Sequence, residues 1–299
     1  MAESKISFFT KEEIRCPVCA EQFKKEEILT GRGRLNAKEL SPELRRIYEP
    51  TAKFGAVYPL VYTMNVCPNC WFSALANDFG RLAPEKAHLL ADLTDYRKEL
   101  IKQIFRPLVV DFYEPRDLIS GAASYILALS TYSFYPDSFA PTFQRAIFSL
   151  RAAWIFGDLA SEHNKYQGRF YKIQEVFYMK AKHYYNKSYE VMSKNKERFE
   201  SVYLGPDTDK NYGYDGFIYL INYLNFKTAY LEEDIMKKAD IYQEIKRNIG
   251  RIFGIGKASK EKPGPLLQIV RELYEDVAMY LQEIEESTDM HFEDTEEEE

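Results

Sequence analysis

Four cysteines are the residues of this chain best suited to chemistry, and they occur as two pairs with identical spacing. The pairs read Cys16-Pro17-Val18-Cys19 and Cys67-Pro68-Asn69-Cys70. Two residues between thiolates let the backbone turn so that both sulfurs face one point, and two such turns form a tetrahedral site. Four protein ligands close such a site, which is typical of a structural metal ion rather than a catalytic one. The sequence therefore predicts one structural Zn²⁺ held by Cys16, Cys19, Cys67 and Cys70.

Three other uses of the cysteine pairs compete with zinc binding. Disulfide bonds are rare in cytosolic proteins. A redox motif would not need a second copy, and no thioredoxin-like strand–helix–strand pattern surrounds either pair. Iron in a rubredoxin-like site uses the same four thiolates, and tetrahedral sulfur geometry alone does not distinguish it from zinc. Zinc is the preferred ion, and iron is the alternative that stays open.

Two features near the cysteines bear on the geometry of the site. Glycine often follows the second cysteine of a metal-binding turn, because the backbone there is left-handed. Ala20 and Trp71 occupy these positions here, so we expect both turns to form at a small cost in strain. The pairs are also separated by residues 20–66, a longer spacing than in most zinc ribbons. This spacing predicts a folded segment between the two turns.

The elements that position the cysteines follow from the pattern of the remaining chain. We expect a mainly α protein with a small N-terminal β-containing zinc-ribbon-like module over residues 1–77. A helical domain is expected over residues 78–286, and a disordered acidic tail over residues 287–299. The C-terminal domain is predicted to contain antiparallel helical pairs.

Individual elements are predicted from turn residues, prolines and periodicity. In the metal module we expect a hairpin arm at 23–35, a short helix or 3₁₀ segment at 36–49 and a strand at 57–66. Prolines near helix starts and the apolar periodicity predict the helices that follow. The expected helices span residues 84–105, 115–135, 141–162, 169–196, 216–230, 232–253 and 264–286.

One stretch without charged residues, Leu118 to Pro136, is a possible membrane-spanning segment. It contains glycine, serine and threonine and has about the minimum length for crossing a bilayer. We expect a buried central helix there rather than a membrane span. No secretory signal is visible, because charges occupy the N-terminal positions where an apolar segment should lie, and a cytoplasmic location is expected.

Small residues at regular positions hint at tetratricopeptide-like packing of helix pairs. Ile147, Leu150 and Trp154 share one face of the first helix of the better copy. Ala181, Tyr185 and Ser188 take the corresponding spacing on the second helix. A second copy at 219–245 is weaker, and a generic helical bundle explains the periodicity equally well.

Several segments together resemble a known family. They are the two cysteine pairs, the run YTMNVCPNCWFSAL around the second pair, LAPEK at a helix start and RAAWIFGDLA further along. The chain resembles a bacterial family of unknown function that joins a split zinc-ribbon-like head to tetratricopeptide-like helices. The resemblance extends over residues 14–245. It implies metal binding and protein–protein interaction, and it supplies no assigned activity.

Charge argues against a general nucleic-acid-binding role. The net charge is −6, and without the seven acids of residues 289–299 it is +1. A basic stripe of the kind that binds phosphate backbones is therefore not expected. Arg32 and Arg34, on a glycine-flanked loop of the metal module, form the basis of an alternative function as a zinc-ribbon nucleic-acid-binding protein. Neighbouring glutamates cancel much of their charge.

Candidate catalytic residues do not form a recognisable set. Glu85 and His88 form half of a di-iron motif, and the sequence has no second half. His163 and His183 could meet in space, but four histidines in the whole chain make a histidine-based hydrolase site improbable. The Gly254–Lys257 segment lacks the spacing of a phosphate-binding loop. We therefore expect a non-enzymatic scaffold that binds a protein or peptide on its helical face.

Overall fold

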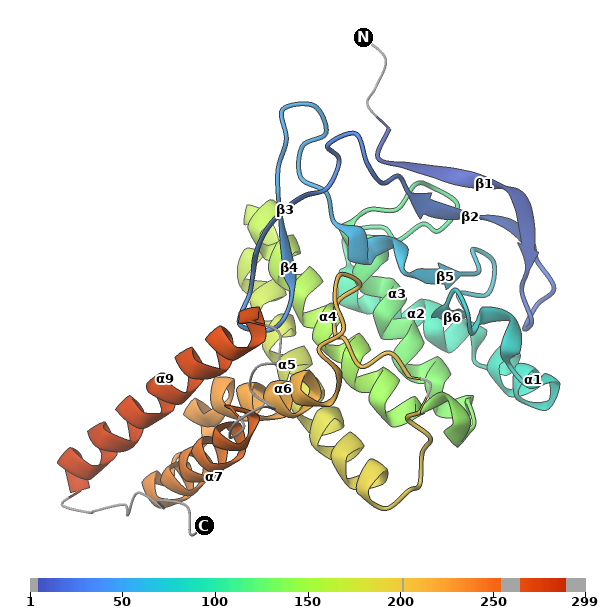
Figure 1. Ribbon diagram of the computed structural model, residues 1–299. Coiled ribbons are helices and arrows are strands. Elements are labelled where there is room, and N and C mark those ends of the chain that lie inside the picture. The colour runs from blue at the N-terminus through green and yellow to red at the C-terminus, as the bar shows by residue number, and fades with distance from the viewer. Residues whose placement is uncertain (1–4, 201, 254–263, 289–299) are drawn as a thin grey trace. The chain divides into compact units, whose positions relative to one another are not determined.

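The computed structural model of this chain describes residues 5–200, 202–253 and 264–288 (Figure 1). The chain divides into two compact units. Unit 1 comprises residues 1–39, 46–202 and 206–208, and unit 2 comprises residues 40–45, 203–205 and 209–299. Unit 1 contains all four cysteines together with the first five helices. The proposed boundary at residue 77 stays a prediction.

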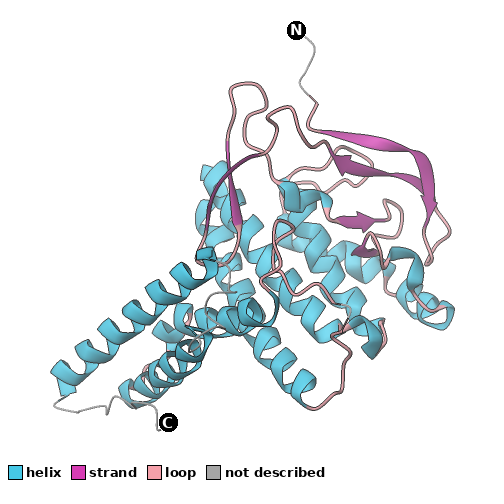
Figure 2. Ribbon diagram, in the orientation of Figure 1, coloured by secondary structure: helices cyan, strands magenta, loops and turns pink. Residues whose placement is uncertain are grey.

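The strands, magenta in Figure 2, all precede residue 76 in the described residues, where they form three two-stranded sheets. β1 pairs antiparallel with β2, with Arg15 opposite Gln22. β5 pairs antiparallel with β6, with Val66 opposite Ser73. The strands are β1 Ser7–Arg15, β2 Gln22–Ile28, β3 Asn36–Leu40, β4 Arg46–Glu49, β5 Met64–Val66 and β6 Ser73–Leu75.

The expectations for this region are partly wrong. β2 pairs with a strand that precedes the first cysteine pair, not with a second strand inside 23–35, because the cysteine turn itself connects the two strands. Residues 36–49 form β3 and β4 instead of a short helix. The chain reverses between them at Leu44, which has a φ of +58°. The expected strand at 57–66 is a 3₁₀ turn, Pro59–Tyr62, followed by the short β5.

The helices of unit 1 lie close to their expected positions. The predicted helix 84–105 is interrupted at Leu93, and the predicted helix 141–162 is confirmed at both ends. Asp117 caps the helix that follows it, because its carboxylate accepts from the Ser120 N–H while the Ser120 hydroxyl accepts from the Asp117 N–H. The helices are α1 Pro84–Asp92, α2 Thr94–Phe105, α3 Leu118–Thr131, α4 Pro141–Glu162 and α5 Gln167–Ser193.

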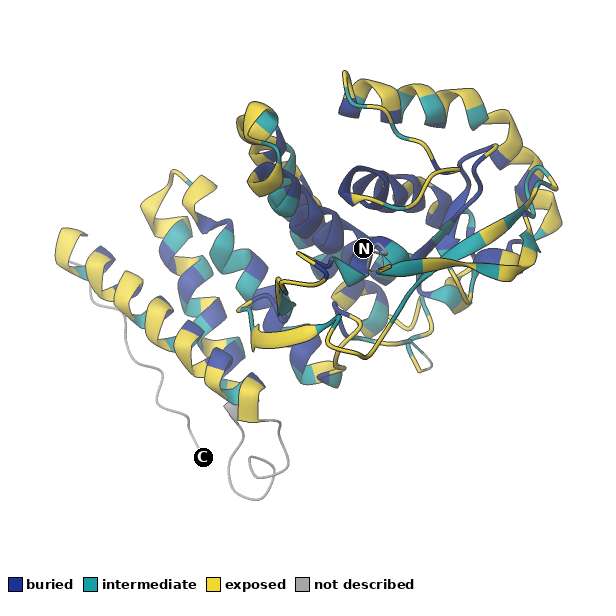
Figure 3. Ribbon diagram, turned by 90° about the horizontal axis from the view of Figure 1, so that it is seen from above, coloured by how far each residue is buried: buried dark blue, intermediate teal, exposed yellow. Residues whose placement is uncertain are grey.

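α3 is a buried helix that packs against β5 and β6, the strands on either side of the second cysteine pair. The Ser73 hydroxyl of β6 donates to the Ser124 carbonyl at 2.8 Å. A Cβ atom at Gly121 would lie 2.8 Å from a methyl carbon of Val61, so only glycine permits this close approach. Most residues of α3 are buried, whereas β1 and β2 consist of exposed and intermediate residues, which are yellow and teal in Figure 3. Over the described residues, no helix has both the length and the apolar character required to cross a bilayer.

α4 and α5 form a long helix pair in unit 1. The three residues expected on one face of α4, Ile147, Leu150 and Trp154, are all buried. Ala181, Tyr185 and Ser188 of α5 are also buried. Both predicted faces thus lie in the core, where small residues at Ala181 and Ser188 leave room for a neighbouring helix.

In its described residues, unit 2 is built mainly from three helices. They are α6 Gly213–Lys227, α7 Ile235–Phe253 and α9 Gly264–Thr288. Tyr242 of α7 stacks on Tyr280 of α9. Residues 40–45 belong to this unit, where the Tyr219 hydroxyl donates to the Pro42 carbonyl at 2.7 Å. The expected acidic tail lies outside the described residues, apart from its first two positions, which end α9.

Candidate metal centre

The first cysteine pair forms the turn between β1 and β2. The Cys16 N–H donates to the Glu21 carbonyl at 2.8 Å, and the Ala20 N–H donates to the Cys16 carbonyl at 3.0 Å. These bonds close the turn and bring both thiols to its inner side. Ala20 has a φ of +63°, so the left-handed position expected from the sequence is confirmed.

The second cysteine pair forms the same turn between β5 and β6. The Cys67 N–H donates to the Phe72 carbonyl at 2.9 Å, and the Trp71 N–H donates to the Cys67 carbonyl at 2.9 Å. Trp71 has a φ of +58°. The chain therefore builds one local structure twice, each time at the end of an antiparallel ribbon.

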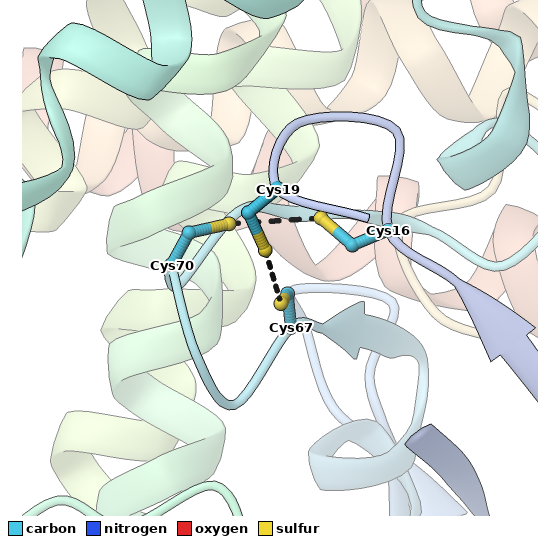
Figure 4. Close-up of side chains that lie close together, drawn as sticks. All are labelled: Cys16, Cys19, Cys67 and Cys70. Carbon is cyan, nitrogen blue, oxygen red and sulfur yellow. Dashed lines mark hydrogen bonds between the residues drawn. The ribbon is translucent and has the colours of Figure 1, made fainter. Parts of the chain in front are cut away.

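The two turns face each other, and their four thiols converge (Figure 4). The four Sγ atoms lie within 4.8 Å of one another. The Sγ atoms of Cys16 and Cys70 are 3.6 Å apart, and those of Cys19 and Cys67 are 3.5 Å apart. A tetrahedral ion with metal–sulfur bonds of about 2.3 Å requires sulfur separations of about 3.8 Å. The cluster thus fits a metal ion with four thiolate ligands, and it could hold one.

Protonation of the thiols is governed by their crowding. Contacts among the thiols, together with burial, raise the pKa of Cys16, Cys67 and Cys70 to about 12. Burial also acts to raise the pKa of Cys19, but the Glu21 N–H and the neighbouring thiols outweigh it, so that this pKa is lowered. A divalent cation reverses the preference of such a cluster, because a coordinating thiol loses its proton.

Polar groups around the cluster also favour thiolates. The Val18 N–H donates to the Cys16 Sγ at 3.4 Å. The side-chain amide of Asn69 donates across to the Cys19 Sγ at 3.6 Å, so a residue of the second turn supports a ligand of the first. Hydrogen bonds of this kind favour the charged form of the acceptor and orient it toward a metal.

A buried arginine beside the centre is a feature that the sequence analysis missed. Arg97 of α2 donates to the Cys70 carbonyl at 2.9 Å, and it is only 2% exposed. It shares the buried face of α2 with Ile101 and Phe105. Its spacing of four residues from Ile101, on an otherwise apolar face, was the available signal.

The other candidate residues lie apart from the cysteine cluster. Arg34 donates to the Lys5 and Gly31 carbonyls, and its guanidinium lies 4.9 Å from the centre of the Phe54 ring. Arg32 is exposed. Glu85 and His88 both lie on the exposed side of α1, and His183 is exposed on α5. The Gly254–Lys257 segment lies outside the described residues.

Comparison with known proteins agrees with the resemblance drawn from the sequence. A family model described as "Uncharacterized protein conserved in bacteria (DUF2225)" matches residues 9–277. An "Uncharacterized protein" of Borreliella burgdorferi (strain B31) is 40% identical over 275 residues, which cover 90% of this chain and 95% of the relative. No solved structure matches the chain. The extent of both matches places the chain in a family: it belongs to the bacterial family DUF2225.

Proposed function

We propose that this protein is a non-enzymatic scaffold whose four cysteines hold one structural Zn²⁺ and whose helices bind a protein or peptide partner. The observation that carries the proposal is the convergence of the four thiols from two equivalent turns. Zinc suits this donor set, because it accepts tetrahedral sulfur coordination and does not change its redox state. Iron is the alternative ion for the same ligands.

The role proposed for the ion is structural, because four protein thiolates leave no coordination position for a substrate. Three of the four cysteines are buried, which agrees with a centre that is closed to solvent. Bound zinc would supply folding free energy to the two ribbons. Free thiols also suit a reducing compartment, which supports the proposed cytoplasmic location.

The proposed partner-binding role depends on the helical part of the chain. The buried small residues of α4 and α5 support tetratricopeptide-like packing of this pair. On the outer side of α5, Tyr171, Val176 and Met179 are at least 40% exposed. These side chains lie among exposed charged residues, including Lys172 and Glu175, and such a mixed surface with tyrosine and methionine suits contact with a partner protein. Nucleic-acid binding through Arg32 and Arg34 stays a prediction.

Metal content tests the first part of the proposal. Elemental analysis of the purified full chain should find about one zinc per chain, as expected for a single four-thiolate site. Cys67→Ser should lose the metal and unfold the ribbons, because structural sites contribute folding free energy directly. Val66→Thr is the matched control, since it adds a hydroxyl at the adjacent buried position and keeps all four thiols. Unchanged zinc content in Cys67→Ser would overturn the ligand assignment.

Affinity capture tests the second part. The tagged full chain should retain a protein from lysate of its native cell. Val176→Glu should abolish that retention, because it replaces an exposed apolar side chain on the outer side of α5 with a charge. Lys86→Glu, on the exposed side of α1, is the control for a change in charge elsewhere. Equal capture by wild type and Val176→Glu would argue against this face. If the wild type instead retains nucleic acid and Arg32→Ala does not, the result would favour the alternative function.

A further inference from the structure

Arg97 is a buried cation at a position where burial is costly. Its side chain lies on the inner face of α2, and it is 2% exposed. Transferring a guanidinium out of water costs several kcal/mol unless an opposite charge compensates it. A buried arginine therefore calls for a nearby anion.

The hydrogen-bond partners of Arg97 are all neutral. One terminal nitrogen donates to the Cys70 carbonyl at 2.9 Å and to the Thr94 hydroxyl at 3.1 Å. The other donates to the Leu90 carbonyl. The Nε is buried and has no hydrogen-bond partner. Within residues 5–200, 202–253 and 264–288, no carboxylate forms an ion pair with this guanidinium.

The anionic groups available to Arg97 are the cysteines. Burial lowers the pKa of Arg97, and Cys70, Cys16 and Cys67 act in the opposite direction by electrostatic attraction. Neutral thiols would leave the guanidinium without a counter-charge. Four thiolates around a divalent cation carry a net charge of −2, which supplies one.

We propose that Arg97 is the buried counter-charge of the metal centre and makes it selective for divalent ions. Two observations support this inference: the hydrogen bond from Arg97 to the Cys70 carbonyl, and the lack of a carboxylate paired with Arg97 in the described residues. The inference rests on the proposed function. A divalent ion with four thiolates has a charge of −2, whereas a trivalent ion leaves −1. Arg97 attracts the centre of charge −2 more strongly than the centre of charge −1. It therefore favours Zn²⁺ or Fe²⁺ over Fe³⁺ in the same ligand set.

The counter-charge role and a purely structural role predict different results for Arg97→Met. Met occupies similar space without charge, so it removes the uncompensated cation from the metal-free, reduced protein. Replacement of buried ionic groups by apolar ones is often neutral or stabilising. The charge role therefore predicts metal-free stability that is unchanged or higher, together with weaker zinc binding. The structural role predicts lower stability with and without metal.

Zinc competition against a chromophoric chelator, with the full chain, gives the first measurement. The dissociation constant for Zn²⁺ should rise about 10–100-fold in Arg97→Met, the usual range for loss of a group that supports a metal ligand. Arg97→Lys keeps the charge and should recover most of the affinity. Urea unfolding in chelator and reductant should give Arg97→Met a midpoint at or above that of wild type. Equal zinc affinity in wild type and Arg97→Met would overturn the inference while leaving the proposed zinc site intact.

Iron substitution provides a measurement that a structural role would not affect. The one-electron potential of the Fe³⁺/Fe²⁺ couple in iron-loaded protein should fall in Arg97→Met, because the −2 state loses its counter-charge. A tenfold loss of preference for Fe²⁺ corresponds to a fall of about 59 mV. Arg97→Lys should stay near the wild-type potential. An unchanged potential in Arg97→Met would overturn the inference, and failure of wild type to bind either metal would overturn the proposed function with it.

Discussion

Ala20 offers a quantitative test of the first cysteine turn. It is an exposed residue with a φ of +63°, in the left-handed region. This conformation costs about 1–2 kcal/mol for a residue with a Cβ atom. Glycine avoids that cost but gains about 0.4–1 kcal/mol of extra freedom in the unfolded chain. Ala20→Gly should therefore raise the free energy of unfolding by about 0.5–1 kcal/mol.

Tryptophan fluorescence during urea unfolding is a suitable assay. The chain has two tryptophans, Trp71 and Trp154, and both are buried in unit 1. Their signal therefore reports the unit that contains Ala20. Measurements with zinc present should show the Ala20→Gly transition at higher urea, with an unchanged slope, because the change in surface exposed on unfolding is the same.

Ala91→Gly is the matched control. Ala91 is also exposed in unit 1, but it lies in α1, where glycine lowers the free energy of unfolding by about 0.5–1 kcal/mol. The two alanine-to-glycine changes should thus shift the transition in opposite directions. If Ala20→Gly destabilises as Ala91→Gly does, the backbone at residue 20 is not left-handed in the folded protein, and the description of the turn is refuted.

Two further predictions concern the thiols and α3. Because the pKa values of Cys16, Cys67 and Cys70 are raised to about 12, coordination at pH 7 must displace their protons. Zinc affinity should rise with pH by roughly three orders of magnitude per unit near neutrality, and calorimetry in two buffers should detect at least the three corresponding protons; no proton release would contradict this. Gly121→Ala should lower the free energy of unfolding by about 1–3 kcal/mol through its clash with Val61. Val61→Ala in the same chain should relieve part of that loss, and strictly additive losses would speak against the clash.

The cysteine turns and most helices could be predicted because local sequence determines them. A Cys-Pro-x-Cys turn needs only a few consecutive residues, and the left-handed position after it follows from its backbone. The helix 141–162 begins with Pro141 at its first position and was predicted at both ends. These features depend little on distant parts of the chain.

The short helix predicted at 36–49 does not form, because contacts with residues distant in sequence outweigh the helix propensity of this segment. Its alanine, leucine, lysine and glutamate residues favour a helix. Instead, the Ser41 hydroxyl accepts from the Glu43 and Arg45 N–H groups and holds a turn. The Arg46 N–H donates to the Asp207 carboxylate at 2.8 Å, across 161 positions of sequence. No local pattern contains that bond.

Arg97 was missed for a related reason. An arginine within an amphipathic helix is usually read as part of the solvated face, with its charge in water. Its burial follows from the packing of α2 beside the second cysteine turn, which the sequence does not display. Ligand chemistry predicts that the cysteines converge. Residues that pack around the cysteine cluster, such as Arg97, become visible only once the fold is known.

The placement of the two cysteine turns on separate ribbons has a topological consequence. Coordination would join Cys19 to Cys67 and close a ring of chain that includes residues 20–66. Cross-linking a loop of this size removes unfolded-state entropy worth about 4 kcal/mol in the chain-entropy account. A disulfide would provide the same tie only under oxidising conditions, whereas a metal cross-link persists where thiols are reduced. The stability of the two ribbons would then depend on the supply of metal in the cell rather than on the redox state of the cell.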